Sequence, residues 1–279
     1  MMISETFRVA LDSVRANKLR SLLTTLGVVI GIAAVITMVA LGEGAQRTVE
    51  ARLATLGANI VTVRPGQSFF GGVGRGQAPL KVEDAEALLE NPRYIRAVAP
   101  ELEARQQIEH GTANANLSVL GTWPSYFELN NFTVADGRIF TDTEERGRRR
   151  VAVLGALAGE DLGIPSAALL GDTIRVRGVT FSVIGVLDEK GSQGFSNPDD
   201  NVYIPLGTAQ LRVMGSDNIR AIAVQAVDTA SMEPAMVEID RVLRREHRLS
   251  PGEEPDFSVR DQASLLTTMQ ETTRTFSFL

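Results

Sequence analysis

Residues 21–42 read SLLTTLGVVIGIAAVITMVALG, and this stretch contains no Asp, Glu, Lys, Arg or His. An α-helix of this length rises about 33 Å, which is close to the thickness of the hydrocarbon layer of a membrane. Helices buried in soluble proteins seldom run so long without a polar face. The sequence therefore predicts a transmembrane helix over residues 20–42, and the other segments are arranged around it.

The charges on either side of this stretch predict its orientation. Four basic and two acidic residues precede it, and the first charged residue after it is Glu43. Because basic residues stay on the cytoplasmic side, we expect a cytoplasmic N-terminus and an extracytoplasmic chain after Gly42. A cleaved signal peptide would have a shorter apolar region and a small-x-small cleavage site, so we expect an uncleaved anchor. The residues that set this orientation are Arg8, Arg15, Lys18 and Arg20.

Helical patterns continue on both sides of the predicted span. Residues 1–19 predict an amphipathic helix along the cytoplasmic membrane surface, and an extension of the spanning helix is the alternative. Beyond the span, an apolar stripe continues to Leu56, and Gly57 predicts the end of the helix. This continuation predicts a stalk that carries the outer domain. The apolar stripe of residues 1–19 consists of Phe7, Leu11 and Val14.

Two glycines inside the span have the spacing of a helix contact. Gly27 and Gly31 form a GxxxG pattern, which places both on one helix face. Small residues on one face allow another membrane helix to approach closely. Glycine is common in membrane helices, so the pattern is suggestive of partner helices and no more.

Composition excludes several classes of function. The chain has 279 residues, no cysteine and a net charge of −6. Since the first 20 residues carry four basic and two acidic side chains, the remainder has a net charge of −8. That acidity argues against nucleic acid as a partner. The absence of cysteine excludes disulfides, thiol nucleophiles and cysteine metal sites.

The outer part predicts an α+β fold. Two strand–helix–strand patterns, within residues 43–122 and 217–265, are expected to form one α+β sandwich although they lie far apart in sequence. Residues 123–216 contain mostly strand patterns, including a hairpin over 171–189 that turns near Gly178. We therefore expect a β-rich insert between the two halves of the sandwich.

No residues predict catalysis, a metal site or a bound cofactor. His110 and His247 are far apart and are expected at the surface. The carboxylate pairs Asp199–Asp200 and Glu253–Glu254 lie in loops and are expected to be solvated. Glu144–Glu145 beside residues 148–150 predict a solvated turn whose charges compensate each other. We expect a protein that is not an enzyme and binds no cofactor itself.

A glycine-rich stretch could suggest a phosphate site. Residues 66–79 read GQSFFGGVGRGQAP, without the lysine of a phosphate-binding loop and with Gln77 at the last glycine position of a dinucleotide motif. The sequence predicts a mobile surface loop here.

Several segments together resemble a known family. They are ANKLRSLLTTLGVVIGIAAVITMVALGEGA, LGANIVTVRPG, WPSYFELNNFTVADGRIFTDTE, VAVLG and GDTIRVRGVTFSVIGVLDEKG. These resemble the first membrane segment and the periplasmic core domain of the MacB/FtsX-type ABC transporter permeases. The resemblance covers the whole chain and implies a porter-like α+β domain, split in sequence, with an inserted lobe.

The resemblance implies a function in transport. It suggests a permease subunit of the inner membrane that works with an ATPase, which binds the ATP, and with a second permease copy or a homologous permease. In MacB-like members the outer domain transmits motion and docks a periplasmic adaptor protein. The family continues into further spans, so residues 266–279 are expected to start a second, truncated span. The alternative is a single-span anchor that presents an extracytoplasmic binding module, and the substrate is not predicted.

Overall fold

The computed structural model describes residues 17–55, 59–66, 68–70, 73–75, 79–191 and 197–261. Most of the predicted N-terminal helix, with Arg8 and Arg15, lies outside the described residues, as do Gly57 and residues 266–279. By its internal contacts the chain divides into two compact units, Met1–Arg52 and Leu53–Leu279.

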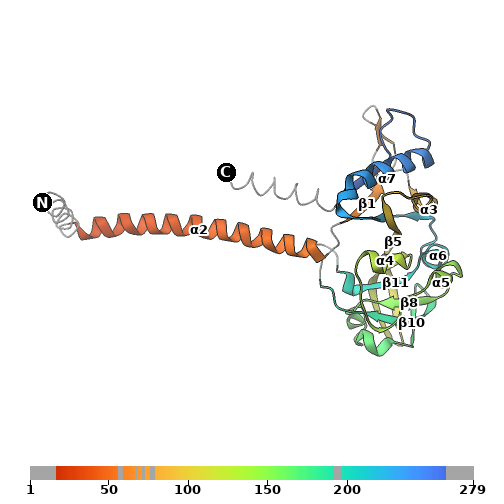
Figure 1. Ribbon diagram of the computed structural model, residues 1–279. Coiled ribbons are helices and arrows are strands. Elements are labelled where there is room, and N and C mark those ends of the chain that lie inside the picture. Colours follow the sequence, from red (N-terminus) through yellow and green to blue (C-terminus); the bar gives the residue numbers. More distant parts are fainter. Residues whose placement is uncertain are drawn as a thin grey trace. The chain divides into compact units, whose positions relative to one another are not determined.

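Helix α2 (Lys18–Thr55) is the described element of the first unit and runs for 38 residues (Figure 1). Its segment Lys18–Ala40 has a mean hydropathy of 2.5 and no buried residues, so its length and composition suffice to cross a membrane. It is the one helix among the described residues that meets this condition. The predicted span and its helical continuation are both present in α2.

Three threonines of α2 form hydrogen bonds within the helix through their hydroxyl groups. The Oγ1 atoms of Thr24, Thr25 and Thr37 donate to the carbonyl oxygens of Arg20, Ser21 and Ala33 at 2.9, 2.8 and 2.7 Å. Hydroxyl groups bonded in this way need no water. Polar residues within the predicted span are therefore compatible with a lipid environment.

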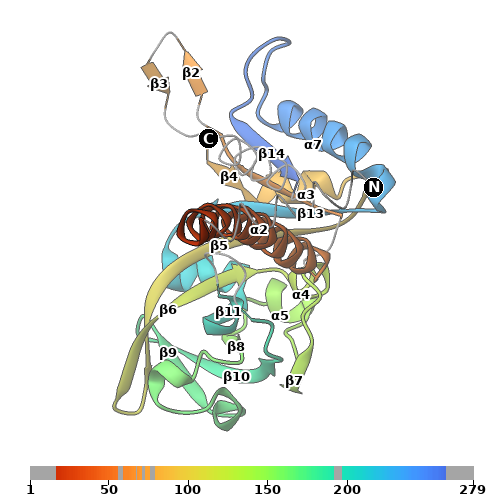
Figure 2. The ribbon, with the colours of Figure 1, turned by 90° about the vertical axis from the view of Figure 1, so that its left-hand side faces the viewer.

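The second unit is built on one sheet of ten strands. They are β1 (Ile60–Pro65), β5 (Ile95–His110), β6 (Ala113–Thr122), β7 (Val134–Gly137), β8 (Val151–Leu154), β9 (Thr173–Val176), β10 (Val179–Leu187), β11 (Asn201–Pro205), β13 (Ala221–Ala226) and β14 (Phe257–Asp261). Hydrogen-bonded neighbours follow the order β14–β1–β13–β5–β6–β11–β8–β10–β7, and β9 pairs with both β10 and β5 (Figure 2).

The first part of this sheet is a ferredoxin-like subdomain. Strands β14, β1, β13 and β5 are all antiparallel to their neighbours. Helix α3 (Val82–Leu88) connects β1 to β5, α7 (Met232–Glu246) connects β13 to β14, and the two helices pack together. Each strand–helix–strand unit encloses a strand of the other, which is the split arrangement of the ferredoxin-like fold. The α+β fold predicted for these two sequence-distant segments is confirmed.

The ferredoxin-like core forms between the helices and one face of the sheet. On α7, Ala235, Ile239 and Leu243 recur at helical spacing and are fully buried. Ile239 and Leu243 belong to the same apolar cluster as Val63 and Val224 of the strands. Burial of this stripe, at about 25 cal/mol per Å², holds the helix on the sheet.

The second part of the sheet closes into a six-stranded barrel. Strands β5, β6, β11, β8, β10 and β9 pair in turn, and β9 returns to β5 through Ile108 opposite Val176. Ile108, Ile174 and Phe181 are completely buried in its apolar core. Closure leaves the ring without a free edge. The predicted β-rich lobe is confirmed as β structure, whereas its limits at residues 123 and 216 stay predictions.

Strand β5 belongs to both parts. Its first half, from Ile95 to Glu101, pairs with β13, and the residues from Glu101 to His110 pair with β6. The sixteen residues of β5 therefore connect the ferredoxin-like sheet to the barrel by continuous backbone hydrogen bonds.

Turn chemistry agrees with the predicted hairpin over residues 171–189. Strands β9 and β10 are joined by Arg177 and Gly178, at φ values of 47° and 80°. Two successive residues with positive φ form the type I′ turn that matches strand twist, and glycine adopts the second position without strain.

The glycine-rich stretch differs from its prediction as a loop. Strands β2 (Ser68–Phe70) and β3 (Val73–Arg75) pair as a small antiparallel hairpin within it. Alternation of larger residues with glycine was too weak a pattern to predict these short strands. A short 3₁₀ helix, η1 (Glu160–Leu162), follows β8.

Candidate functional site

The apolar surface of α2 is the first candidate for a functional surface. Leu22, Val35 and Met38 are 65%, 63% and 68% exposed, on a segment whose residues are nearly all exposed. Such a continuous apolar surface is unfavourable in water and favourable against lipid or another helix. Lys18 and Arg20 are exposed in the first turn, where the sequence places orienting charges.

The two glycines predicted for helix contact have open space beside them. A Cβ atom at Gly27 or Gly31 would meet no atom within 4 Å. That space is accessible to a neighbouring helix, and the contact itself stays a prediction.

His247 is at the centre of a buried ionic cluster. Its Nδ1 lies 2.7 Å from Oδ1 of Asp256, and its Nε2 lies 3.3 Å from Oδ1 of Asp84. The hydrogen bond to Asp84, followed by that to Asp256, raises the pKa of His247 to about 9, so the imidazole is a cation at neutral pH. The cation links the end of α7 to α3 and to the residue before β14.

The prediction that His247 is a surface residue is wrong. Only 10% of its side chain is exposed, and the Phe257 ring packs edge-on against it at 5.8 Å. Asp84 also accepts the backbone N–H of Lys81 at 2.8 Å and so begins helix α3. His110 is the contrasting case, since its partner Asp172 at 2.9 Å is 55% exposed.

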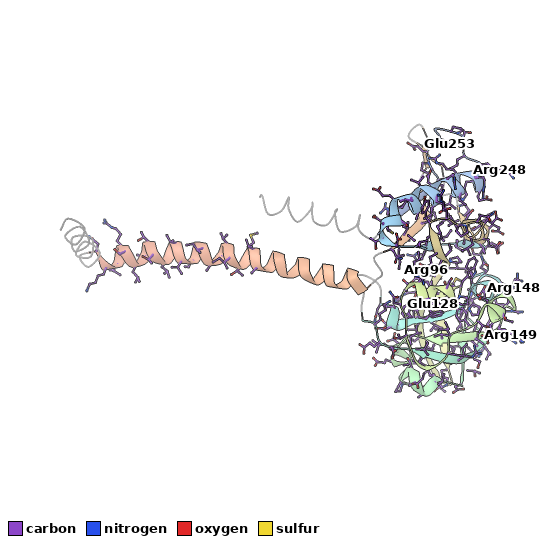
Figure 3. The ribbon with its side chains drawn as sticks, viewed as in Figure 1. Arg96, Glu128, Arg148, Arg149, Arg248 and Glu253 are labelled. Atoms are coloured by element: carbon purple, nitrogen blue, oxygen red, sulfur yellow. The ribbon has the colours of Figure 1, made fainter. Side chains whose placement is uncertain are left out.

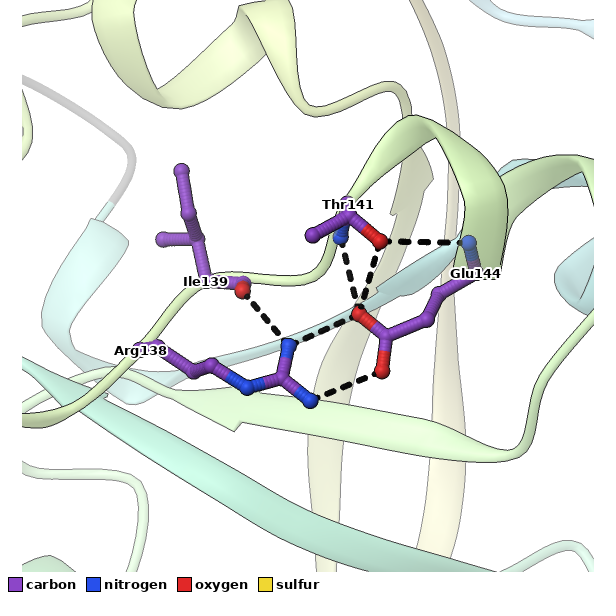
Figure 4. A network of polar contacts seen from close by, with 4 residues as sticks. All are labelled: Arg138, Ile139, Thr141 and Glu144. Carbon is purple, nitrogen blue, oxygen red and sulfur yellow. Dashed lines mark hydrogen bonds and ion pairs between the residues drawn. The ribbon is translucent and has the colours of Figure 1, made fainter.

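Glu144 forms a surface ion pair in place of the predicted self-compensating turn. Nη1 and Nη2 of Arg138 donate to Oε2 and Oε1 of Glu144 at 2.7 and 2.8 Å (Figure 4). Thr141 adds a capping box at the start of α5 (Asp142–Arg146). The Arg138 hydrogen bond lowers the pKa of Glu144 to about 2. Arg148 and Arg149 are exposed, as predicted (Figure 3).

Two other carboxylates predicted as solvated hold backbone amides instead. Oε1 of Glu145 accepts the N–H of Gly207 at 2.8 Å, and burial raises the pKa of Glu145. Asp199 is 1% exposed and accepts the N–H groups of Lys190 and Gly191 at 2.9 and 2.6 Å. These predictions are wrong because the binding amides lie in other segments of the chain. Glu253 and its neighbour Glu254 are exposed, as predicted (Figure 3).

Glu101 lies where β5 changes partners from β13 to β6. It is opposite Ala221 on one side and Thr122 on the other. Burial, supported by the charge of Glu103, raises the pKa of Glu101 to about 7, and Arg64 and Arg220 act in the opposite direction. No sequence pattern distinguished this carboxyl group from the other charged residues of the strand.

The residues that the structure describes include no group of three or more His, Asp or Glu side chains placed to hold a metal ion. The structure adds no residue to a catalytic or cofactor site, and the expectation that the chain is not an enzyme stays a prediction.

Comparison with known proteins identifies the fold family. The MacB-like periplasmic core domain matches residues 21–242. The chain belongs to this family. It is 31% identical over 272 residues to the macrolide export ATP-binding/permease protein MacB of Bdellovibrio bacteriovorus, covering 96% of this chain and 42% of that protein. It is 35% identical to the MacB protein of Rhodospirillum rubrum, covering 99% of this chain and 42% of the relative.

Solved structures of MacB-like domains share the fold. The periplasmic region of MacB from Actinobacillus actinomycetemcomitans matches with a TM-score of 0.64 at 23% identity, over 78% of this chain and 95% of that one. The extracellular domain of the ABC-type transporter YknZ from Gram-positive bacteria matches with a TM-score of 0.59 at 19% identity, over 73% and 100%. The resemblance to MacB/FtsX-type permeases is therefore confirmed.

The match covers only part of the length of each relative. The chain spans about two fifths of the length of the MacB relatives that it matches, 42% in the first of them. The chain therefore combines a MacB-like periplasmic core domain with a helix, α2, whose length and composition suffice to cross a membrane.

Proposed function

We propose that this chain transmits motion between a membrane and the extracytoplasmic space in an ABC-type export system. Its partners would be an ATPase that binds and hydrolyses ATP, and a second permease copy, homologous or identical. The membrane would be the inner membrane, with the N-terminus in the cytoplasm and lipid around α2. The chain itself would bind no cofactor and catalyse no reaction.

The observation that carries this proposal is the unbroken length of α2. The apolar segment Lys18–Ala40 is followed by a further fifteen residues of the same helix, up to Thr55. These fifteen residues add about 22 Å of helix beyond the apolar segment. A continuous helix transmits displacement and rotation better than a flexible linker would.

The outer domain supports the same role. Strand β5 joins the ferredoxin-like subdomain and the barrel through one continuous sheet, so a force on one part reaches the other through paired backbone. The relatives are named as ATP-binding/permease proteins for macrolide export, which favours transport over a stand-alone binding module. A periplasmic adaptor protein is a further proposed partner, and the substrate class is not specified by these matches.

The test interrupts α2 in the complete transporter. Thr48→Pro removes a helical hydrogen bond and kinks the helix at a cost of about 3 kcal/mol, whereas the matched variant Thr48→Ala preserves it. Because the chain has no cysteine, Arg149→Cys introduces a single spin label on the exposed surface of the lobe. Pulsed electron paramagnetic resonance of the transporter in nanodiscs then measures the distance between the labels on two copies of this chain, with and without ATP.

We expect ATP to change this distance in the otherwise unmodified protein and in Thr48→Ala, and to leave it unchanged in Thr48→Pro, which should still hydrolyse ATP. The absence of a defined inter-copy distance would refute the two-copy arrangement. The same ATP response in both Thr48 variants would refute transmission through α2.

Orientation has its own test. Replacing Arg8, Arg15, Lys18 and Arg20 with Glu is expected to invert or weaken the topology, because cytoplasmic basic residues determine it. Protease added outside the membrane should then no longer digest the outer domain. Unchanged digestion would contradict the proposed orientation.

A further inference from the structure

A polar cavity of about 410 Å³ opens on the outer face of the sheet, beside the point where β5 and β6 pair. Its volume lies within the range of about 300–1,000 Å³ that small-molecule sites occupy. The strand side of the lining consists of Glu103, Ala104, Arg105, Leu117, Ser118 and Arg220. The opposite wall consists of Asp161, Asn197, Asp200 and Asn201.

On the strand side of the cavity Glu103 is paired with Arg220, which leaves Arg105 as the unpaired charge there, and the opposite wall carries Asp161 and Asp200. In the sheet Arg105 is opposite Ser118, and Ser118 is opposite Asn201, so these three residues form one row over three strands. With about 4.8 Å between neighbouring strands, the backbone of Arg105 is about 10 Å from that of Asn201 and its neighbour Asp200. Arg105 therefore faces the acidic wall across a hydroxyl group.

The two outermost charges have no partners of their own. In the described part of the chain, neither Arg105 nor Asp161 makes a side-chain hydrogen bond or ion pair. The other charged groups are engaged, because Glu103 accepts the Ser118 hydroxyl at 2.7 Å, Arg220 lies 3.8 Å from Glu103, and Oδ2 of Asp200 accepts Nδ2 of Asn197 at 2.7 Å. One free guanidinium and one free carboxylate thus remain for a ligand.

We propose that this cavity binds a short peptide with free termini, whose carboxylate pairs with Arg105 and whose ammonium group pairs with Asp161. An extended peptide of three residues spans about 10 Å, which matches the separation of the two charged sides. The planar guanidinium accepts a carboxylate by two parallel hydrogen bonds.

The lining of the cavity comes from both parts of the outer domain. Arg220 immediately precedes β13 of the ferredoxin-like sheet, whereas Asp161 and Asp200 belong to the barrel lobe. A bound peptide would contact both parts at once. This binding goes beyond the proposed transmission of motion and does not depend on an ATPase, so either proposal can fail without the other.

The experiment titrates the full chain in nanodiscs with trialanine by isothermal calorimetry. Three modified peptides serve as probes of each charge: acetylated trialanine, trialanine amide, and the peptide with both ends blocked. The test variants are Arg105→Gln and Asp161→Asn. Their matched controls are Arg96→Gln, an exposed arginine of the same strand β5 (Figure 3), and Glu160→Gln, the exposed neighbour of Asp161 in η1.

We expect saturable binding of trialanine with a dissociation constant of about 1 mM or below. Each test variant should weaken it at least about tenfold, each single block should do the same, and the control variants should match the wild type. No saturation by 10 mM, roughly ten times that constant, would overturn the proposal. So would binding that is unchanged by either test variant, or equal binding of trialanine amide, which would indicate a site for cations alone.

Discussion

The ferredoxin-like subdomain and the barrel lobe each hold a short ion pair, enclosed in the first and exposed in the second. In the first, helices cover one face of an open sheet, and the cation of His247 is enclosed where α7, α3 and β14 meet. In the second, the ring uses its interior for apolar side chains, and Arg138 and Glu144 pair on its outside. The shortest distance is 2.7 Å in both clusters, but His247 is 10% exposed and Arg138 is 54% exposed.

This comparison teaches that exposure, more than distance, decides what an ion pair contributes. Breaking a buried pair leaves a charge without solvent, which costs about 3–5 kcal/mol. Breaking an exposed pair returns both groups to water, so the loss is about 0–1 kcal/mol. The ferredoxin-like subdomain should therefore depend on its charges, and the barrel on its apolar core.

The largest expected effect comes from the barrel core. Phe181→Ala removes a completely buried ring from β10 and should lower the free energy of unfolding by about 3–5 kcal/mol. Val237→Ala on α7 is the control, because Val237 is 70% exposed and should change stability by less than about 0.5 kcal/mol. Denaturant unfolding of the chain in nanodiscs, followed by circular dichroism, measures both. Equal effects would show that the barrel core does not hold the lobe together.

The next effect comes from the buried cation. His247→Gln leaves Asp84 and Asp256 near each other without a positive charge, which should cost about 3 kcal/mol, the lower end of the range for a buried pair, because the imidazole retains some exposure. His110→Gln is the matched control, since His110 also pairs with an aspartate but at an exposed site, and should cost less than about 1 kcal/mol. Similar losses in the two variants would contradict the role given to exposure.

The pH dependence of stability tests the contribution of the protonated His247. The folded pKa of His247 is about 9, above the ordinary value of 6.5, so its stabilisation is complete below pH 6.5 and is lost as pH rises through 9. The expected loss is about 2 kcal/mol after allowance for solvent screening. Melting temperatures measured from pH 6 to 10 should fall in the wild type and change less in His247→Gln. Parallel curves for the two proteins would refute the assignment.

Local patterns predicted the elements well, and distant contacts explain what they missed. The hairpin at Gly178 and the apolar stripe of α7 follow from turn chemistry and helical spacing, which depend on neighbouring residues alone. The partners of His247 are different, because Asp84 precedes it by 163 residues. The sequence marks Asp84 as an acidic residue of a helix start, and nothing local indicates a second role.

The same limit applies to the barrel. Its closure depends on Ile108 meeting Val176, and neither strand carries a pattern that selects the other. In the candidate cavity, Arg105 and Asp161 come from separate segments, and no local pattern relates the two residues. One of the missed contacts could have been predicted from the sequence. Thr141 and Glu144 have the spacing of a capping box, which predicts that the glutamate bonds the start of the helix.

The smallest expected effect tests the exposed side of the comparison. Glu144→Gln removes the charge that pairs with Arg138 but keeps an oxygen for the cap of α5, so the loss should stay below about 1 kcal/mol. Because the folded pKa of Glu144 is about 2, below its ordinary 4.5, this stabilisation is present above pH 4.5 and disappears as pH falls toward 2. Glu128→Gln, at an exposed site on α4 (Ser125–Leu129), should have no effect in either range (Figure 3). A loss of stability as large as that of His247→Gln would mean that the geometry of the bidentate Arg138–Glu144 pair, and not its exposure, determines its contribution. The difference between the two parts of the domain would then rest on geometry.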